Sequence, residues 1–278
     1  MKSAFKKVMN TIPRPWLIRL SFAARPVLIW FFKGKNFTDP IDGRSYHNFL
    51  PYGYENQRKN ALSPGTLSLE RHRLLWLYLR DETDFFTSNY KVLHMAPEQA
   101  FYERFRKLGN LDYTTCDLNS PIADVKADIK NLPFPDNSFD VVFCNHVLEH
   151  IDDDKKAISE LYRVMKPNGW GIFQVPIRYS LLETFEDPTI TDKKERKEKF
   201  GQYDHVRVYG MDYYDRLREM GFVVEEVNYS TQLSDEEIRR YGLEKNELLP
   251  VVRKISESNS KNFTRKIADW FRGKKRMT

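Results

Sequence analysis

Cysteine is scarce in this chain of 278 residues: only Cys116 and Cys144 occur, each within an apolar run. Two cysteines exclude a disulfide-rich scaffold and favour a reducing compartment. The chain also lacks the GxxxxGK[ST] phosphate-binding loop and the HExxH zinc-binding helix, so it does not carry the chemistry of those two motifs.

No apolar run is long and uninterrupted enough to predict a transmembrane helix. The run at residues 16–32, WLIRLSFAARPVLIWFF, is broken by Arg19, Arg25 and Pro26. It also lacks the small-residue cleavage pattern of a secretory signal. We therefore predict a cytoplasmic protein.

Acidic residues are absent from the first 35 residues, which carry a charge of +8, while residues 253–278 carry +7. Because the net charge is only +6, residues 36–252 carry −9. Two basic ends around an acidic body argue against nucleic-acid binding across the whole surface. They favour contact of the ends with an anionic surface.

The basic N-terminal segment, residues 1–35, has two interpretations. One is an amphipathic segment in the membrane interface, with its large apolar side chains in lipid and its cations at phosphates. The other is a helix that covers the protein's own core. Residues 261–276, within the basic tail 256–278, repeat the pattern, which supports a peripheral position on the inner face of a membrane. The apolar residues concerned are Trp16, Leu20, Phe31 and Phe32, and in the tail Phe263, Ile267, Trp270 and Phe271.

Residues 36–87 contain two Pro/Gly turns with the spacing of a zinc ribbon but without cysteines. Asp39, Asp42, Ser63 and Thr66 stand where CxxC…CxxC would place its ligands. Carboxylates and hydroxyls make a poor structural zinc site, so we predict a ribbon-like element without a metal. A helix follows at residues 67–82, with its leucines directed inward.

From residue 88 to about 255 the pattern alternates between strands and helices. Such alternation predicts an α/β fold with a mainly parallel sheet and helices on both faces. We expect the last strand at an edge of the sheet. The expected strands are 90–95, 112–116, 139–144, 170–175, 222–228 and 248–255, and the helices are 98–108, 152–165 and 212–220.

Polar residues follow these strands at the edge where ligands bind in parallel sheets. The Ala96-Pro97-Glu98 turn opens a helix, whose free N–H groups suit a carboxylate. Asp117 ends the second strand, where an acid accepts hydrogen bonds from two ribose hydroxyls. Asp128 is placed to accept from an exocyclic amine, and Asn145 with His146 follows the fourth strand.

Residues 127–176 resemble a class I S-adenosylmethionine-dependent methyltransferase of the type 11 kind. The tract LPFPDNSFDVV, the VLEHI element and a helix ending in ELYRVMKPNGW carry the resemblance. It implies a Rossmann-like, seven-stranded sheet and S-adenosyl-L-methionine as cofactor. Residues 37–67 and 200–222 resemble a subgroup with a ribbon before the core, and residues 177–211 would form its lid or acceptor insertion.

The resemblance assigns cofactor-binding roles to this sequence. It assigns the methionine part to the turn after the first strand, the ribose to Asp117 and the adenine to Asp128; Asn145 and His146 would lie near the sulfonium. Glu149 and His150 are expected to anchor the next helix, and no metal ligands are implied. The turn HMAPE departs from the family's glycine-rich pattern. The full cofactor set is His94, Met95, Ala96, Pro97, Glu98, Asp117, Leu118, Asp128, Ile129, Asn145 and His146.

Methyl transfer to a hydroxyl or amine benefits from a general base, for which His146 and His205 are the candidates. Each histidine also has a purely structural interpretation. We expect an O- or N-methyltransferase acting on a small-molecule or lipid-linked acceptor. The alternatives are a catalytically silent interaction protein and a nucleic-acid methyltransferase; the acidic body and the absence of an [N/D]PP[Y/F] tetrapeptide argue against the latter.

Overall fold

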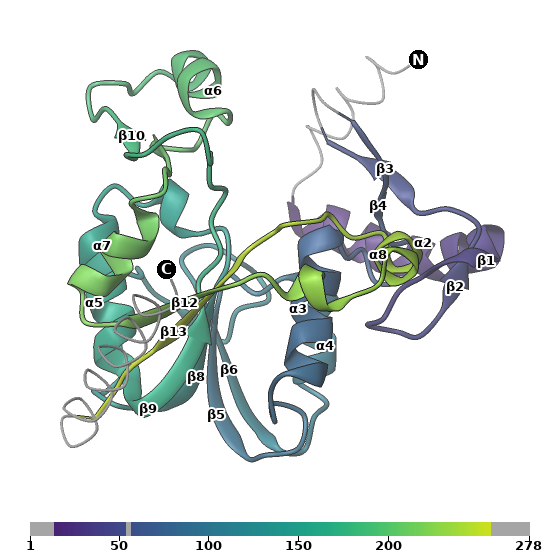
Figure 1. Ribbon diagram of the computed structural model, residues 1–278, viewed down its shortest axis with the longest axis horizontal. Helices are drawn as coiled ribbons and strands as arrows, with labels where there is room; N and C mark the ends of the chain where they lie inside the picture. The colour runs from purple at the N-terminus through teal and green to yellow at the C-terminus, as the bar shows by residue number, and fades with distance from the viewer. Residues whose placement is uncertain (1–13, 54–56, 257–278) are drawn as a thin grey trace, which may run out of the picture. The chain divides into compact units, whose positions relative to one another are not determined.

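The computed structural model describes residues 14–53 and 57–256 (Figure 1). They fall into two compact units. The first comprises residues up to Ser88 with Glu98–Asn110 and Asn228–Leu248, and the second comprises Asn89–Pro97, Leu111–Val227 and residues from Leu249. The tail predicted at 261–276 and the first 13 residues of the basic N-terminal segment, which include Lys2, Lys6 and Lys7, lie outside the described residues.

The second unit is built on a seven-stranded sheet with the order β12-β13-β9-β8-β5-β6-β7 (Figure 1). All neighbouring strands are parallel except β13, which is antiparallel to both β12 and β9. The predicted α/β fold with a mainly parallel, seven-stranded sheet is thus confirmed. The strands are β5 (Tyr90–Met95), β6 (Leu111–Asp117), β7 (Val125–Lys126), β8 (Phe139–Cys144), β9 (Met165–Ile172), β12 (Val223–Val227) and β13 (Leu249–Arg253).

The central strands form because their side chains are apolar on both faces. The last four residues of β5 and of β8 are all buried, which is typical of parallel strands covered on both sides. Helices α5 (Asp154–Val164) and α7 (Tyr213–Glu219) and the 3₁₀ turn η1 (Leu148–His150) complete this core.

Two sequence expectations about this sheet are wrong. The strand expected at the edge, β13, lies between β12 and β9, because the chain returns to pair with both. The strand expected at 170–175 begins instead at Met165, directly after α5. Its register shifts between the pairs Phe139–Met165 and Val141–Trp170. The KPNG stop signal therefore lies within an irregular strand rather than in a loop, with Asn168 in the left-handed region at φ 64°.

Between β9 and α7 the chain forms a small insertion. Strands β10 (Phe185–Glu186) and β11 (Arg207–Val208) pair antiparallel, and helix α6 (Lys193–Phe200) lies between them in sequence. The Asp192 carboxylate accepts hydrogen bonds from the first backbone N–H groups of α6, and Gly201 ends it at φ 88°. The buried side chains of Ile190, Phe200 and Val208 give the insertion its own apolar cluster.

The first unit contains two short antiparallel hairpins and several helices. Buried leucines of α3 and the stacked rings of Phe101 and Phe105, whose centroids are 5.2 Å apart, form its core. The predicted inward leucines of this helix are found there. The elements are α2 (Arg14–Phe32), β1 (Lys33–Thr38), β2 (Ser45–Tyr46), β3 (Leu50–Tyr52), β4 (Arg58–Leu62), α3 (Glu70–Asp81), α4 (Gln99–Phe105), η2 (Tyr229–Gln232) and α8 (Asp235–Tyr241).

The two turns of the ribbon-like element meet through hydrogen bonds. Asp39 is fully buried, and its Oδ2 accepts from the hydroxyls of Thr66 and Ser68. Burial and the charge of Asp39 raise the pKa of Asp42, whose Oδ2 accepts from Tyr46 at 3.2 Å. Hydroxyl-to-carboxylate bonds thus join the two turns, as the metal does in a zinc ribbon.

Arg73 links separate segments of the first unit through hydrogen bonds. Its side chain is fully buried and donates to four backbone carbonyls, and burial lowers its pKa to about 10. A planar guanidinium is suited to this task because its donors have a fixed geometry. The acceptors are the carbonyl oxygens of Ala61, Ser68, Tyr241 and Gly242.

Helix α2 has a packed side and an exposed apolar side. Arg25 is paired with Glu103 of α4 at 3.1 Å. Val27, Trp30 and Phe31 are 66%, 78% and 69% exposed. Within the described ranges, no helix has the length and apolarity needed to cross a bilayer.

Candidate functional site

The register of the sheet brings the predicted cofactor residues of the second unit to one edge. Met95 of β5 lies opposite Cys116 of β6 and Cys144 of β8. The next residues, Ala96, Asp117 and Asn145, therefore leave parallel strands at the same level. Polar groups at this carboxyl edge are placed as in other parallel α/β sheets that bind ligands.

The turn after β5 has the conformation that glycine usually adopts. Ala96 has φ 47°, in the left-handed region, and its N–H donates to the Cys116 carbonyl at 2.9 Å. Alanine in this region costs about 1 kcal/mol relative to glycine. The glycine-free sequence HMAPE therefore still makes the tight turn at the end of β5.

The other residues of this turn are largely buried. His94 is fully buried, with Nδ1 2.7 Å from the Tyr113 hydroxyl, and Met95 and Pro97 are buried as well. Glu98 belongs to the first unit, where its Oε1 lies 3.9 Å from Nε2 of His72.

Asp117 has one carboxylate oxygen that is occupied and one that is not. Oδ1 accepts from the backbone N–H groups of Asn119 and Ser120 and so holds the turn after β6. Oδ2 has no hydrogen-bond partner among the residues that the structure describes. The next side chain, Leu118, is apolar and 59% exposed. An acceptor oxygen beside an exposed apolar side chain suits a ribose next to an aromatic base.

Asp128 and Ile129 follow β7. Oδ1 of Asp128 accepts from the Lys130 N–H at 2.9 Å, and the side chain is 45% exposed. Ile129 is buried, with 4% of its surface exposed. The closest ion-pair partner of Lys130 is Asp152, with 2.7 Å between Nζ and Oδ1. Asp128 lies farther from the same ammonium group, at 3.9 Å.

Asn145 carries a buried donor without an acceptor. Its Oδ1 accepts from the Gln174 N–H at 3.3 Å, while its Nδ2 is buried and unpaired among the described residues. His146 adopts φ 54°, and its N–H donates to the Gln174 carbonyl at 2.7 Å. A buried amide group without a partner costs about 1–3 kcal/mol, which a bound ligand would recover.

His146 and Glu149 form a pair. Nδ1 of His146 lies 3.2 Å from Oε1 of Glu149, whose side chain is 2% exposed. Burial raises the pKa of Glu149, but the hydrogen bond and the charges of His146 and His150 outweigh it, so the pKa is lowered overall. The N-cap of α5 is Asp153, whose side chain accepts from the Lys156 N–H, and the anchoring of this helix by Glu149 and His150 stays a prediction.

His205 lies beside a cavity in the insertion. The cavity has a volume of about 380 Å³ and is lined by residues that include Pro176, Ile177, Phe200 and His205. Such a volume falls in the range of small-molecule pockets. Burial lowers the pKa of His205, which favours the neutral form of its ring.

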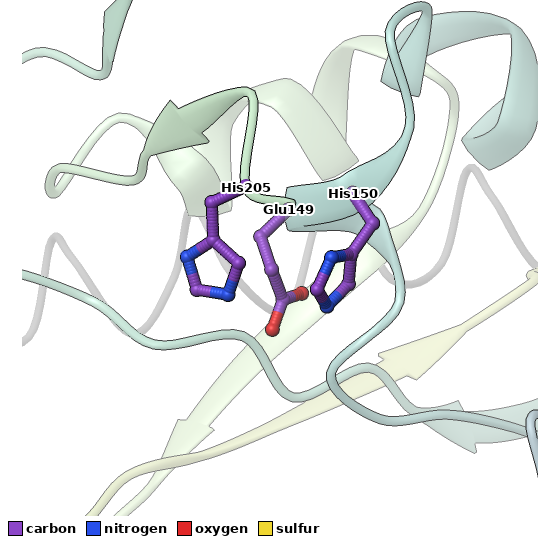
Figure 2. A group of neighbouring side chains, drawn as sticks. All are labelled: Glu149, His150 and His205. Carbon is purple, nitrogen blue, oxygen red and sulfur yellow. The ribbon is translucent and has the colours of Figure 1, made fainter. Parts of the chain in front are cut away.

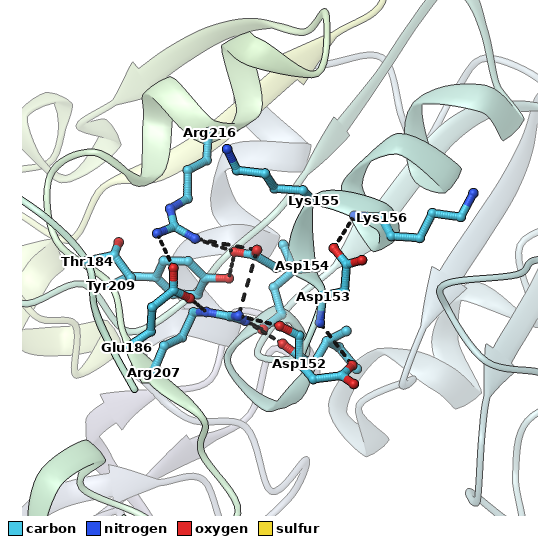
Figure 3. A network of polar contacts seen from close by, with 12 residues as sticks. Asp152, Asp153, Asp154, Lys155, Lys156, Thr184, Glu186, Arg207, Tyr209 and Arg216 are labelled. Atoms are coloured by element: carbon cyan, nitrogen blue, oxygen red, sulfur yellow. Dashed lines mark hydrogen bonds and ion pairs between the residues drawn. The ribbon is translucent and has the colours of Figure 1, made fainter. Parts of the chain in front are cut away.

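Arg207 ties the insertion to η1 and the start of α5 (Figure 3). Its side chain is 3% exposed and donates to the carbonyls of Leu148, Ile151 and Asp152 and to Glu186. The same network continues through Asp154. That carboxylate accepts from Tyr209 at 2.7 Å and from Arg216 at 3.2 Å.

The sequence missed one association, that of Glu149 and His150 with His205 (Figure 2). One ligand atom from each of the three side chains lies within 4.8 Å of the others. Local sequence patterns contain no signal for this cluster, because it depends on the fold of the insertion.

A model of the family described as methyltransferase domain matches residues 88–173. The chain is similar to the uncharacterized methyltransferase YcgJ of Bacillus subtilis, at 32% identity over 80 residues, covering 28% of each chain. It is also similar to the malonyl-[acyl-carrier protein] O-methyltransferase of Buchnera aphidicola, at 31% identity over 118 residues, covering 39% of this chain and 48% of that protein.

Among solved structures, an S-adenosylmethionine-dependent methyltransferase from Mesorhizobium loti superposes with a TM-score of 0.46 at 17% identity, covering 65% of this chain and 97% of that one. The matched region spans less than half the length of the two curated relatives.

Proposed function

We propose, from the premise that residues 88–173 are a class I S-adenosylmethionine-dependent methyltransferase domain, that this chain transfers a methyl group to an oxygen or nitrogen atom of a small-molecule or lipid-linked acceptor. The observation that carries the proposal is the alignment of Ala96, Asp117 and Asn145 at one edge of the sheet.

The residues at this edge fit the cofactor. Oδ2 of Asp117 is available to accept from ribose hydroxyls, and the buried Nδ2 of Asn145 needs an acceptor. Asp128 and Ile129 would hold the adenine, and the turn at Ala96 would receive the methionine part. When bound, S-adenosylmethionine supplies an activated methyl group on a sulfonium.

His146 is the proton acceptor that the geometry supports best. If Nδ1 donates to Glu149, then Nε2 carries a lone pair, and it has no hydrogen-bond partner among the described residues. Such a pair resembles the base-and-orienter arrangement of other general bases. The protein's remaining task is to align the acceptor and exclude water, and the cavity beside His205 offers space for an acceptor.

A labelling experiment tests the proposal. The purified chain is incubated with [methyl-³H]S-adenosylmethionine and a metabolite and lipid extract from cells that lack this protein. Label is expected in a small organic molecule, and it should be lost with Asp117→Asn but kept with Asp112→Asn, a change at the other end of the same strand. Label in RNA would contradict the acceptor class. Cofactor binding without transfer to any fraction would favour the silent interaction protein.

We also propose that α2 binds an anionic membrane surface. Its exposed Val27, Trp30 and Phe31 are followed by Lys33 and Lys35, a combination typical of interfacial segments. Such a position suits a lipid-linked acceptor.

Flotation with vesicles containing phosphatidylserine tests this association. The full chain should float, and Trp30→Ser with Phe31→Ser should reduce the floated fraction several-fold. Leu182→Ser is the matched control, because that apolar side chain is 82% exposed in the insertion. An equal loss in the control would contradict a specific role of α2.

A further inference from the structure

We infer that Glu149, His150 and His205 form a binding site for a divalent transition-metal ion. The three side chains come from η1 and from the loop before β11, both within the second unit. Figure 2 shows the Glu149 carboxylate between the two imidazole rings. Metal binding by this cluster does not depend on the proposed methyl transfer.

The hydrogen bonds of the two histidines leave the correct ring atoms available. Nδ1 of His205 lies 3.2 Å from the Phe200 carbonyl, and Nδ1 of His150 lies 3.2 Å from the Asp204 carbonyl. A carbonyl oxygen only accepts, so each Nδ1 carries the proton and each Nε2 carries a lone pair. Histidine ligands in metal sites are usually oriented by such a bond from the second ring nitrogen.

Two buried atoms of the cluster lack a hydrogen-bond partner in the described part of the chain. They are Nε2 of His205 and Oε2 of Glu149, whose side chain is 2% exposed. An unpaired buried carboxylate oxygen is costly, because burial removes its water without replacing it. A cation in contact with both atoms would satisfy them together, while Oε1 remains with His146.

The donor set selects the kind of ion. Two imidazole nitrogens and one carboxylate oxygen suit Zn²⁺, Mn²⁺ or Fe²⁺, whereas Mg²⁺ prefers oxygen ligands. Two ligand atoms on one tetrahedral Zn²⁺ lie about 3.4 Å apart. Since one ligand atom from each side chain lies within 4.8 Å of the other two, binding needs side-chain movements on the order of 1 Å. The backbone bond from the Val206 N–H to the Glu149 carbonyl, at 2.9 Å, already holds the two segments together.

The position of the site narrows the class of acceptor. His205 also lines the cavity of about 380 Å³, so a molecule in the cavity would lie beside an ion held by His205. A metal ion lowers the pKa of a bound hydroxyl. If the proposed methyl transfer holds, an acceptor with an ionisable hydroxyl is favoured over an amine, and this step alone rests on that proposal.

Titration of the metal-free, untagged full chain with Zn²⁺ against a chromogenic chelator tests the site. One equivalent should bind, and Glu149→Gln and His205→Asn should each weaken binding more than 10-fold. His205→Cys keeps a zinc ligand and should restore most of the affinity. His47→Asn removes an exposed histidine of the first unit and should change nothing. Mg²⁺ added in excess over Zn²⁺ should not displace the bound Zn²⁺.

Thermal unfolding with and without Zn²⁺ shows whether each variant is folded and whether the ion stabilises it. Zn²⁺ should raise the melting temperature of the wild type by several degrees. His205→Asn should unfold cooperatively, but Zn²⁺ should not raise its melting temperature. Absence of stoichiometric Zn²⁺ binding to the wild type, as expected if a buried water satisfies the cluster, would overturn the inference. An equal loss of Zn²⁺ affinity in His47→Asn and in His205→Asn would also overturn it. S-adenosylhomocysteine binding, measured in parallel, separates failure of this site from failure of the cofactor site.

Discussion

Replacement of Arg207 by leucine tests how the insertion is held on the domain. The Arg207 side chain is 3% exposed and makes four hydrogen bonds, three to backbone carbonyls and one to Glu186 at 2.8 Å. Leucine removes these donors from the carbonyls of Leu148, Ile151 and Asp152 and leaves Asp154, 3.8 Å from the guanidinium, with one cation fewer, while Glu186 keeps its bond from Arg216. Loss of one partner of a buried ionic network costs about 3–5 kcal/mol.

The matched control is Arg218→Leu, which removes the same side chain at the surface. Arg218 is 43% exposed and pairs with Asp215 and Glu226, each at 2.8 Å. Surface pairs of this kind contribute about 0–1 kcal/mol. Urea unfolding should show the large loss of unfolding free energy in Arg207→Leu only. In that variant, amide hydrogen exchange should also accelerate in residues 177–211. If both variants lose less than about 1 kcal/mol, the reasoning from burial is refuted.

Three further predictions follow from single residues. Asp117→Asn keeps the turn bonds of Oδ1 but removes the second acceptor, so calorimetry should show S-adenosylhomocysteine affinity falling roughly 10- to 100-fold, with Asp112→Asn unchanged. Ala96→Gly relieves the left-handed strain and should raise the free energy of unfolding by about 0.5–1 kcal/mol without loss of cofactor binding; a destabilised variant would contradict the turn geometry. Burial raises the pKa of Glu247 from 4.5 to about 7. The resulting contribution to the free energy of unfolding is fully present below pH 4.5, where the carboxyl group is protonated, and it is lost as the pH rises through about 7. Urea unfolding at about pH 5 and about pH 8 should therefore differ by up to about 3 kcal/mol more in the wild type than in Glu247→Gln, and equal differences would refute it.

The core strands were predictable because their signal is local. The ranges 90–95 and 139–144 are apolar on both faces and match β5 and β8 to the residue. The class I methyltransferase resemblance is confirmed by the family match at residues 88–173. The places of the strands in the sheet were harder to predict, since β13 takes an internal position through pairing that no local pattern encodes.

Helix α6 shows a signal that was present but not used. The charged run before Phe200 looks like a solvated loop edge, yet Asp192 precedes it and Gly201 follows it, and these are capping residues. The hydrogen bond from Thr66 to Asp39 could not be predicted from a local pattern, because it forms only when two turns meet on folding.

The candidate site divides in the same way. Asp117, Asp128 and Asn145 follow strands, so their positions could be read from the sequence once the strands were known. The predicted cofactor roles of these residues, and the catalytic roles of His146 and His205, remain predictions. The contact of His205 with Glu149 and His150 arises from the insertion, whose path is set by Arg207 and not by a local motif.

Calorimetric titration of the full chain with S-adenosylhomocysteine tests the central claim most directly. We predict saturable binding at one site with a Kd in the micromolar range. A titration without heat of binding at several temperatures would contradict the claim that this edge of the sheet holds an adenosyl sulfonium.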